Sequence, residues 1–164
     1  MSTPTSVDDD AETRKRPRKE KSLLARALAY LARREHSRSE LARRLAPHAA
    51  SPEEVQRLLD DLEGKKLLSE RRFVEVLARR RGERFGTARV KQELRAHGVG
   101  EALLREAVGD LSRTELQRAR AVWQRRFGSL PADLAERARQ MRFLAQRGFD
   151  AEVIRRIVGG RDDD

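Results

Sequence analysis

The 164-residue chain contains no cysteine, which excludes disulfide bonds and cysteine-ligated metal sites and suits a reducing compartment. Aromatic residues make up only 4% of the chain. No apolar run approaches the roughly 20 residues that a membrane span requires, and the N-terminal segment lacks the apolar stretch of a secretory signal. These absences predict a cytoplasmic protein with thin apolar seams between helices and no deep core.

Charge is what the chain has in excess. Charged residues make up 39% of the sequence, with 37 Lys and Arg against 27 Asp and Glu. The pI is about 11.0. Both terminal segments mix the two signs, so the basic excess belongs to the middle of the chain. A net charge of +10 favours an anionic partner such as nucleic acid.

The sequence also repeats itself. The strings LARR, LARR and WQRR begin at residues 31, 77 and 123, at equal intervals along the chain. Periods of roughly 40–50 residues with helical patterning are typical of helical-repeat arrays. No segment shows the period-two alternation of a β-strand. The sequence therefore predicts an all-α fold: an elongated array, curved to either hand, of three tandem three-helix repeats and nine helices.

Start and stop signals divide this array into units. Ser51 and Ser112 each stand three residues before a glutamate, which is capping-box spacing, and Pro131 suits the first turn of the eighth helix. Leu24 and Leu28 are predicted to face inward from the first helix. The expected divisions are a disordered charged tail at 1–21, repeats at 22–66, 67–111 and 112–159, and an acidic tail at 160–164.

Arginine pairs recur near the C-terminal end of the first helix of each unit, and further basic residues follow on the second helices. If the units stack with similar rotation, these pairs form a ladder that binds phosphates or carboxylates. The helix macrodipole offers a purely structural alternative, because cations near a C-terminus gain ~0.3–1 kcal/mol. The candidate binding residues are Arg33, Arg34, Arg43, Arg44, Arg79, Arg80, Arg81, Arg89, Lys91, Arg125 and Arg126.

Motifs of catalysis are missing, so we predict a protein that is not an enzyme and has no catalytic residues. There is no Walker loop, no GxSxG and no HExxH. His48 and His97 hold matching repeat positions in different units, without carboxylates at ligand spacing, so no metal and no cofactor are expected. Most aromatic residues are predicted to pack between helices, and Phe85, in a loop, is expected to be the most exposed.

Three blocks follow one another over residues 24–159: ALAYL with SEL from residue 27, RRR with FGTARV and HGV from residue 79, and RFL with RGF from residue 142. Together they resemble the RecX family of regulators of the bacterial RecA recombinase. In that family an acidic pair often precedes the phenylalanine of the fourth helix, whereas here only Glu70 is acidic before Phe73. Any contact of that pair is therefore in question for this chain.

The resemblance implies a negative regulator that lies in the groove of the RecA–single-stranded-DNA filament, and we expect the protein to be a monomer. It would inhibit ATPase, strand exchange and coprotease activities, and so modulate recombinational repair and the SOS response. The arginines would face RecA and in part DNA, with the middle unit contributing most. Three alternatives remain: a nonspecific nucleic-acid-binding repeat protein, a helix-turn-helix transcription factor, and a scaffold for unrelated partners. Binding to bare DNA as tight as to the filament would favour the first, and a footprint on an operator would favour the second. Absence of any interaction with a recombinase would favour the third.

Overall fold

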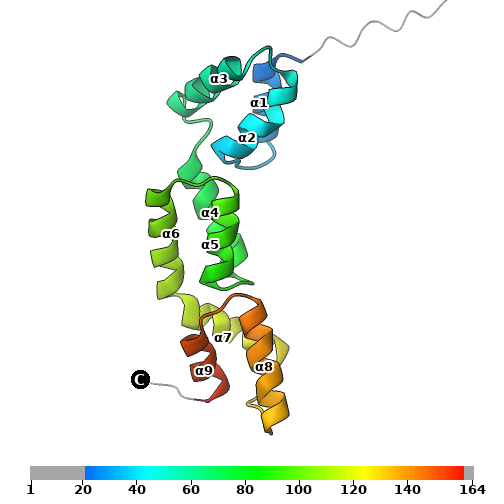
Figure 1. The fold of residues 1–164 in the computed structure, drawn as a ribbon, viewed down its shortest axis with the longest axis vertical. Coiled ribbons are helices and arrows are strands. Elements are labelled where there is room, and N and C mark those ends of the chain that lie inside the picture. The colour runs from blue at the N-terminus through cyan, green and yellow to red at the C-terminus, as the bar shows by residue number, and fades with distance from the viewer. Residues whose placement is uncertain (1–20, 161–164) are drawn as a thin grey trace, which may run out of the picture.

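The computed structural model describes residues 21–160, which form nine α-helices and no β-strand. Figure 1 shows three successive groups of three helices along one long axis, so the predicted elongated all-α array is confirmed. The two predicted tails fall almost entirely outside the described residues. No helix within 21–160 combines the length and apolarity needed to cross a membrane. The elements are α1 (Leu23–Leu31), α2 (Arg38–Leu45), the short 3₁₀ helix η1 (Ala46–His48), α3 (Pro52–Gly64), α4 (Glu70–Gly82), α5 (Thr87–Ala96), α6 (Glu101–Arg113), α7 (Glu115–Arg126), α8 (Leu134–Gln146) and α9 (Ala151–Val158).

Each unit has its own apolar cluster. The clusters are small, and a fully buried leucine contributes about 1.5–3 kcal/mol relative to an exposed one, so a few side chains hold each unit together. Leu68, which follows α3, packs in the cluster of the first unit. Apolar residues with no exposed surface are Ala27, Leu41, Leu45, Leu59 and Leu62 in the first unit, Val90, Leu94 and Leu104 in the second, and Ala119 and Leu144 in the third.

The buried face of α1 differs from the prediction. Leu24 is 44% exposed and Leu28 39% exposed, whereas Ala27 is fully buried. Helix α1 is only nine residues long and packs mainly against α2. A small alanine lets the two backbones approach, and the leucines on either side of that contact remain on the surface.

Two helix starts also differ from the prediction. Ser112 does not begin α7, because α6 continues through Arg113 and only Thr114 separates the two helices. Pro131 lies before α8, which begins at Leu134 with Asp133 as its cap, the Asp133 carboxylate accepting from the Glu136 amide at 2.8 Å. Asp133 thus supplies a side-chain cap to α8, whereas Thr114, at the start of α7, makes no capping hydrogen bond. The predicted cap at Ser51 is confirmed, since its hydroxyl accepts from the Glu54 amide at 3.3 Å.

Candidate nucleic-acid interface

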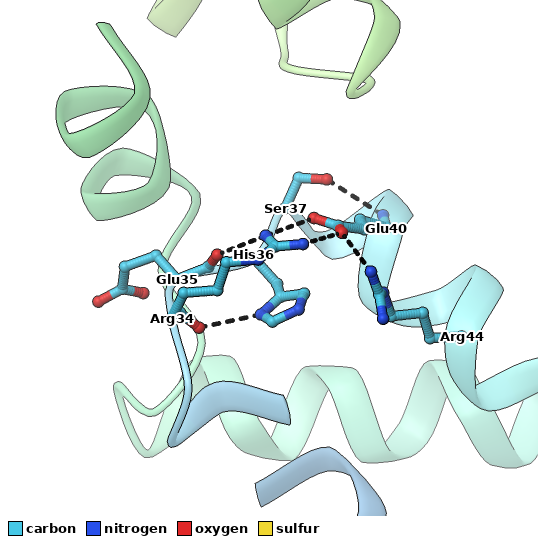
Figure 2. Close-up of polar contacts among 6 residues, drawn as sticks. All are labelled: Arg34, Glu35, His36, Ser37, Glu40 and Arg44. Carbon is cyan, nitrogen blue, oxygen red and sulfur yellow. Dashed lines mark hydrogen bonds and ion pairs between the residues drawn. The ribbon is translucent and has the colours of Figure 1, made fainter. Parts of the chain in front are cut away.

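The four candidate arginines of the first unit divide into paired and exposed groups. Arg34 lies beyond the end of α1 and forms an ion pair with Glu40, and Arg44 donates to the same carboxylate at 3.3 Å. Figure 2 shows both guanidinium groups converging on Glu40. Arg33 and Arg43 are exposed, and neither forms an ion pair within residues 21–160. Two of these four candidates are therefore engaged with Glu40, and two have no ion pair with a described residue.

The chain around Glu40 is fixed by a buried polar cluster. Ser37 caps α2 by accepting from the Glu40 amide at 3.1 Å, which places Glu40 in the first turn. The hydrogen bond from Arg34 lowers the pKa of Glu40 to about 2, despite the opposing effect of burial. His36 is 2% exposed, its Nδ1 lies 2.9 Å from the Arg34 carbonyl oxygen, and burial lowers its pKa. These contacts hold the turn from α1 to α2.

Glu40→Gln is expected to lower the free energy of unfolding at pH 7 by about 2 kcal/mol, since it removes a buried carboxylate from two guanidinium groups. A depressed carboxyl pKa stabilises the fold above the unfolded value and loses that contribution as the pH falls from about 4.5 towards 2. The difference between wild type and variant should therefore shrink in acid. Urea titrations from pH 7 to pH 2 measure it, with Glu53→Gln on the exposed start of α3 as the matched control. A difference that is independent of pH would contradict the assignment.

The middle unit places its candidate cations in different environments. Arg79 and Arg80 are exposed on α4 and form no ion pair with a described residue, while Arg81 pairs with Glu93 of α5 through a 2.6 Å contact. Lys91 is half-buried on α5. Two free guanidinium groups thus remain at the end of α4.

Phe85, which we expected to be exposed, is half-buried against the apolar cluster of the second unit. The Arg81 guanidinium carbon lies 4.6 Å from the centre of its ring and that of Arg89 lies 4.1 Å away. The ring therefore supports arginines and is not an open stacking platform for a base. The prediction of an exposed Phe85 was wrong because the loop folds back onto α4 and α5, where the ring packs against the apolar cluster.

The arginine pair of α7 is divided between two surfaces. Arg125 donates to the Glu83 carbonyl oxygen at 2.9 Å and, with Arg79, borders a groove of about 650 Å³ between α4, α6 and α7. The floor of that groove includes Val74, Leu103 and other apolar side chains. Arg126 does not line that groove; its guanidinium carbon lies 5.5 Å from the centre of the Phe127 ring, and its charge is one of those that lower the pKa of Arg147. The predicted pairs thus line more than one surface.

Two residues of α7 that the sequence did not single out hold the second and third units together. Arg118 donates to the carbonyl oxygens of Gly82, Phe85 and Leu111 at 2.8, 2.7 and 2.9 Å. The buried carboxylate of Glu115 accepts hydrogen bonds from the Thr87 amide at 3.1 Å and from the Asp150 amide at 3.3 Å. Burial lowers the pKa of Arg118. Only the capping spacing before Glu115 gave any signal in the sequence, and it placed the start of α7 at Ser112, slightly before the observed start at Glu115.

The histidines have structural surroundings. His97 packs edge-on against Phe73 with ring centres 5.0 Å apart, and His48 ends the 3₁₀ helix η1. Across residues 21–160, His, Asp and Glu nowhere gather in threes as a metal site would require. The charged surfaces and the groove are therefore the features to which a partner is matched.

The fold and these surfaces define a class of protein: a tandem array of three-helix units that exposes arginines. Models of the first, second and third three-helix domains of RecX match residues 24–62, 69–108 and 114–158. The chain belongs to the RecX family of regulatory proteins.

Individual relatives agree with this assignment. The chain is 56% identical to the regulatory protein RecX of Ralstonia nicotianae over 89% of this chain and 92% of the relative. It is 53% identical to that of Leptothrix cholodnii, covering 84% and 87%, and 44% identical to that of Pseudomonas putida, covering 84% and 90%. The crystal structure of RecX from Lactobacillus salivarius superposes with a TM-score of 0.70 over 84% of this chain and 93% of that one, at 15% identity. That last likeness concerns the fold.

Proposed function

We propose that this cytoplasmic protein is a negative regulator of the RecA recombinase that binds the groove of the RecA–single-stranded-DNA filament. The observation that carries the proposal is the match of three RecX domains, in order, to an elongated array. Binding in the groove would slow ATP hydrolysis, strand exchange and coprotease activity, and thereby modulate recombinational repair and the SOS response. No part of this role requires catalysis by the chain itself.

The three-unit array suits a partner that repeats along an axis. Weak contacts from each unit to successive sites of a filament reinforce one another, because the first contact raises the effective concentration of the next. Exposed arginines are present in every unit, at Arg33, Arg80 and Arg126 among others. Their guanidinium groups suit both carboxylates on a protein and phosphates on DNA. A monomer thus suffices to engage several filament subunits.

The test is the DNA-dependent ATPase rate of RecA while this protein is titrated at substoichiometric ratios. We expect inhibition well below one copy per RecA protomer, in salt at which binding to bare DNA is weak. Inhibition that begins only when the protein saturates the DNA would favour the alternative, a nonspecific nucleic-acid-binding repeat protein. The steep salt dependence of phosphate contacts separates the two cases.

Charge reversal at Arg80 is expected to weaken filament inhibition several-fold without unfolding the second unit, because this exposed side chain of α4 forms no ion pair with a described residue. The measurement is the protein concentration that gives half-maximal inhibition of the ATPase. Arg57→Glu, an equally exposed change on α3 outside the predicted ladder, is the control. Equal inhibition by wild type and Arg80→Glu would remove Arg80 from the interface.

A further inference from the structure

Four arginines from two units meet where the second unit packs on the third. We call Arg84, Arg89, Arg126 and Arg147 the joint cluster. Arg84 follows α4, Arg89 lies on α5, Arg126 ends α7 and Arg147 follows α8. The contact between units that gathers them is short: the Gly86 amide donates to the Arg147 carbonyl oxygen at 2.8 Å.

The side chains of the joint cluster are near enough to act on one another. The Arg89 guanidinium donates across the joint to the Gln146 carbonyl oxygen at 3.3 Å. The pKa of Arg147 is lowered, first by burial and then by the charges of Arg84, Arg89 and Arg126. The guanidinium carbons of Arg84 and Arg89 lie 5.9 and 4.1 Å from the centre of the same Phe85 ring. The Phe127 and Phe143 rings, beside Arg126 and Arg147, have centres 5.1 Å apart. Four positive charges therefore share one small region of the surface.

No carboxylate neutralises this region. None of the ion pairs among residues 21–160 includes a member of the joint cluster. Two acids near the joint are engaged elsewhere: Glu115 accepts from the Thr87 and Asp150 amides, and Asp150 itself caps α9 at 2.8 Å from the Glu152 amide. Elsewhere on the protein, Arg34, Arg72 and Arg81 each have a carboxylate partner. Other arginines without an ion pair, such as Arg33 and Arg80, each lie within one unit, whereas the joint cluster brings unpaired charge from two units together, which favours an external anion.

Aromatic rings hold three of the four guanidinium groups in place. The guanidinium carbon of Arg147 lies 3.9 Å from the centre of the Phe143 ring, that of Arg89 lies 4.1 Å from Phe85, and that of Arg126 lies 5.5 Å from Phe127. The Phe85 ring also lies near Arg81 and, at 5.9 Å, near Arg84, and the Phe127 ring lies 5.7 Å from Arg139. A guanidinium stacked on a ring keeps its N–H edges available and loses less freedom when it binds a phosphate. The site is thus arranged before an anion arrives.

We propose that the joint cluster is a phosphate-binding site that takes consecutive backbone phosphates of single-stranded DNA. This rests on the proposed function, and it assigns these four arginines to the DNA of the filament rather than to RecA. A nucleic-acid backbone supplies closely and regularly spaced charges, which match guanidinium groups gathered at one place. Arg84 and Arg147 join the interface by this reasoning, although the repeat pattern did not select them.

The probe is a fluorescently labelled oligo(dT), with its affinity for the full-length protein measured by anisotropy over a series of salt concentrations. Arg126→Gln with Arg147→Gln removes two contacts, so the log–log salt slope should become shallower by about 1.4, at roughly 0.7 per contact. Arg57→Gln, an exposed arginine of the first unit, should leave the slope unchanged. Restoring the charge with Arg126→Lys and Arg147→Lys should restore most of the slope and leave the affinity several-fold weaker, because lysine lacks the stacked fork.

The outcomes separate this proposal from the proposed function. An unchanged salt slope in the glutamine double variant, or no binding of oligo(dT) by the wild type, overturns the phosphate site. An unchanged slope together with weaker inhibition of the RecA ATPase would place the joint cluster against protein. If the glutamine double variant has a shallower slope but the wild-type protein does not inhibit RecA, the phosphate site is supported and the proposed function is contradicted. Thermal melts establish whether each variant is folded. If the glutamine double variant is unfolded, the single Arg147→Gln variant is measured in its place.

Discussion

Replacing Gly86 by alanine is expected to destabilise the joint between the second and third units by about 3 kcal/mol or more. A Cβ atom at Gly86 would lie 2.1 Å from the Gly148 carbonyl oxygen and 2.2 Å from its carbon. Both are backbone atoms of a turn in which Gly148 itself has a φ of +80°, so the turn cannot rotate away cheaply. The start of α5 would have to move. That movement breaks the hydrogen bond from the Gly86 amide to Arg147.

Urea unfolding followed by circular dichroism measures this effect. Gly64→Ala is the matched control, because nothing lies within 4 Å of a Cβ at that helical position. It should be neutral or stabilise the protein by up to about 1 kcal/mol, since alanine favours a helix over glycine. Equal free energies of unfolding for the two variants would mean that the joint is not closely packed. Because Gly86 carries no side chain, any loss of oligo(dT) affinity in its variant reports on the positions of Arg89 and Arg147.

Arg118→Ala is expected to cost about 3–5 kcal/mol and to uncouple the third unit from the second. The half-buried guanidinium donates to three carbonyl oxygens, those of Gly82, Phe85 and Leu111, and to the Thr87 hydroxyl at 3.1 Å. Without it, carbonyl oxygens at the C-terminal ends of α4 and α6 lose their hydrogen-bond donor at the same place. Lysine should not rescue the protein, because one ammonium group cannot reach four acceptors in a fixed fork.

The control for Arg118 is Arg125→Ala on the same helix. Arg125 is exposed and makes one hydrogen bond to the Glu83 carbonyl oxygen, so its loss should cost less than about 1 kcal/mol. The single tryptophan of the chain, Trp123, is buried in the third unit with its Nε1 donating to Gln140 at 2.8 Å. Its fluorescence during urea unfolding therefore follows that unit directly. Similar unfolding midpoints for the two variants would contradict a central role for Arg118.

Both predictions concern the geometry on which the joint cluster depends. Gly86 sets the approach of the two backbones, and Arg118 holds the helix ends that carry Phe85 and Arg84. Destabilising either should reduce anion binding even though neither residue belongs to the joint cluster. The glutamine variants of Arg126 and Arg147 differ from them, since they remove charge and leave the backbone contact intact. Comparing the two kinds of variant separates architecture from recognition.

Local patterns in the sequence were sufficient for most of the fold. The cap at Ser51 depends on a contact with a residue close by in the chain, Glu54, and it is confirmed. The inward face of α1 was predicted wrongly from Leu24 and Leu28, because a nine-residue helix with one main neighbour buries only a narrow stripe. The start of α8 was misplaced for a different reason: Asp133 caps the helix better than Pro131, which lies three residues before its first residue.

The sequence by itself determined the helical repeat, the excess of arginine and the family, because periodicity, charge and motifs are all carried by neighbouring residues. Only the tertiary structure decided which arginines are available. Arg34 and Arg81 have carboxylate partners, whereas Arg84 and Arg147 approach one another from different units. A long side chain reaches partners far away in the chain, and no spacing along the sequence records which of them it meets. The pairing of charges, and with it the location of a binding site, follows from how the units pack.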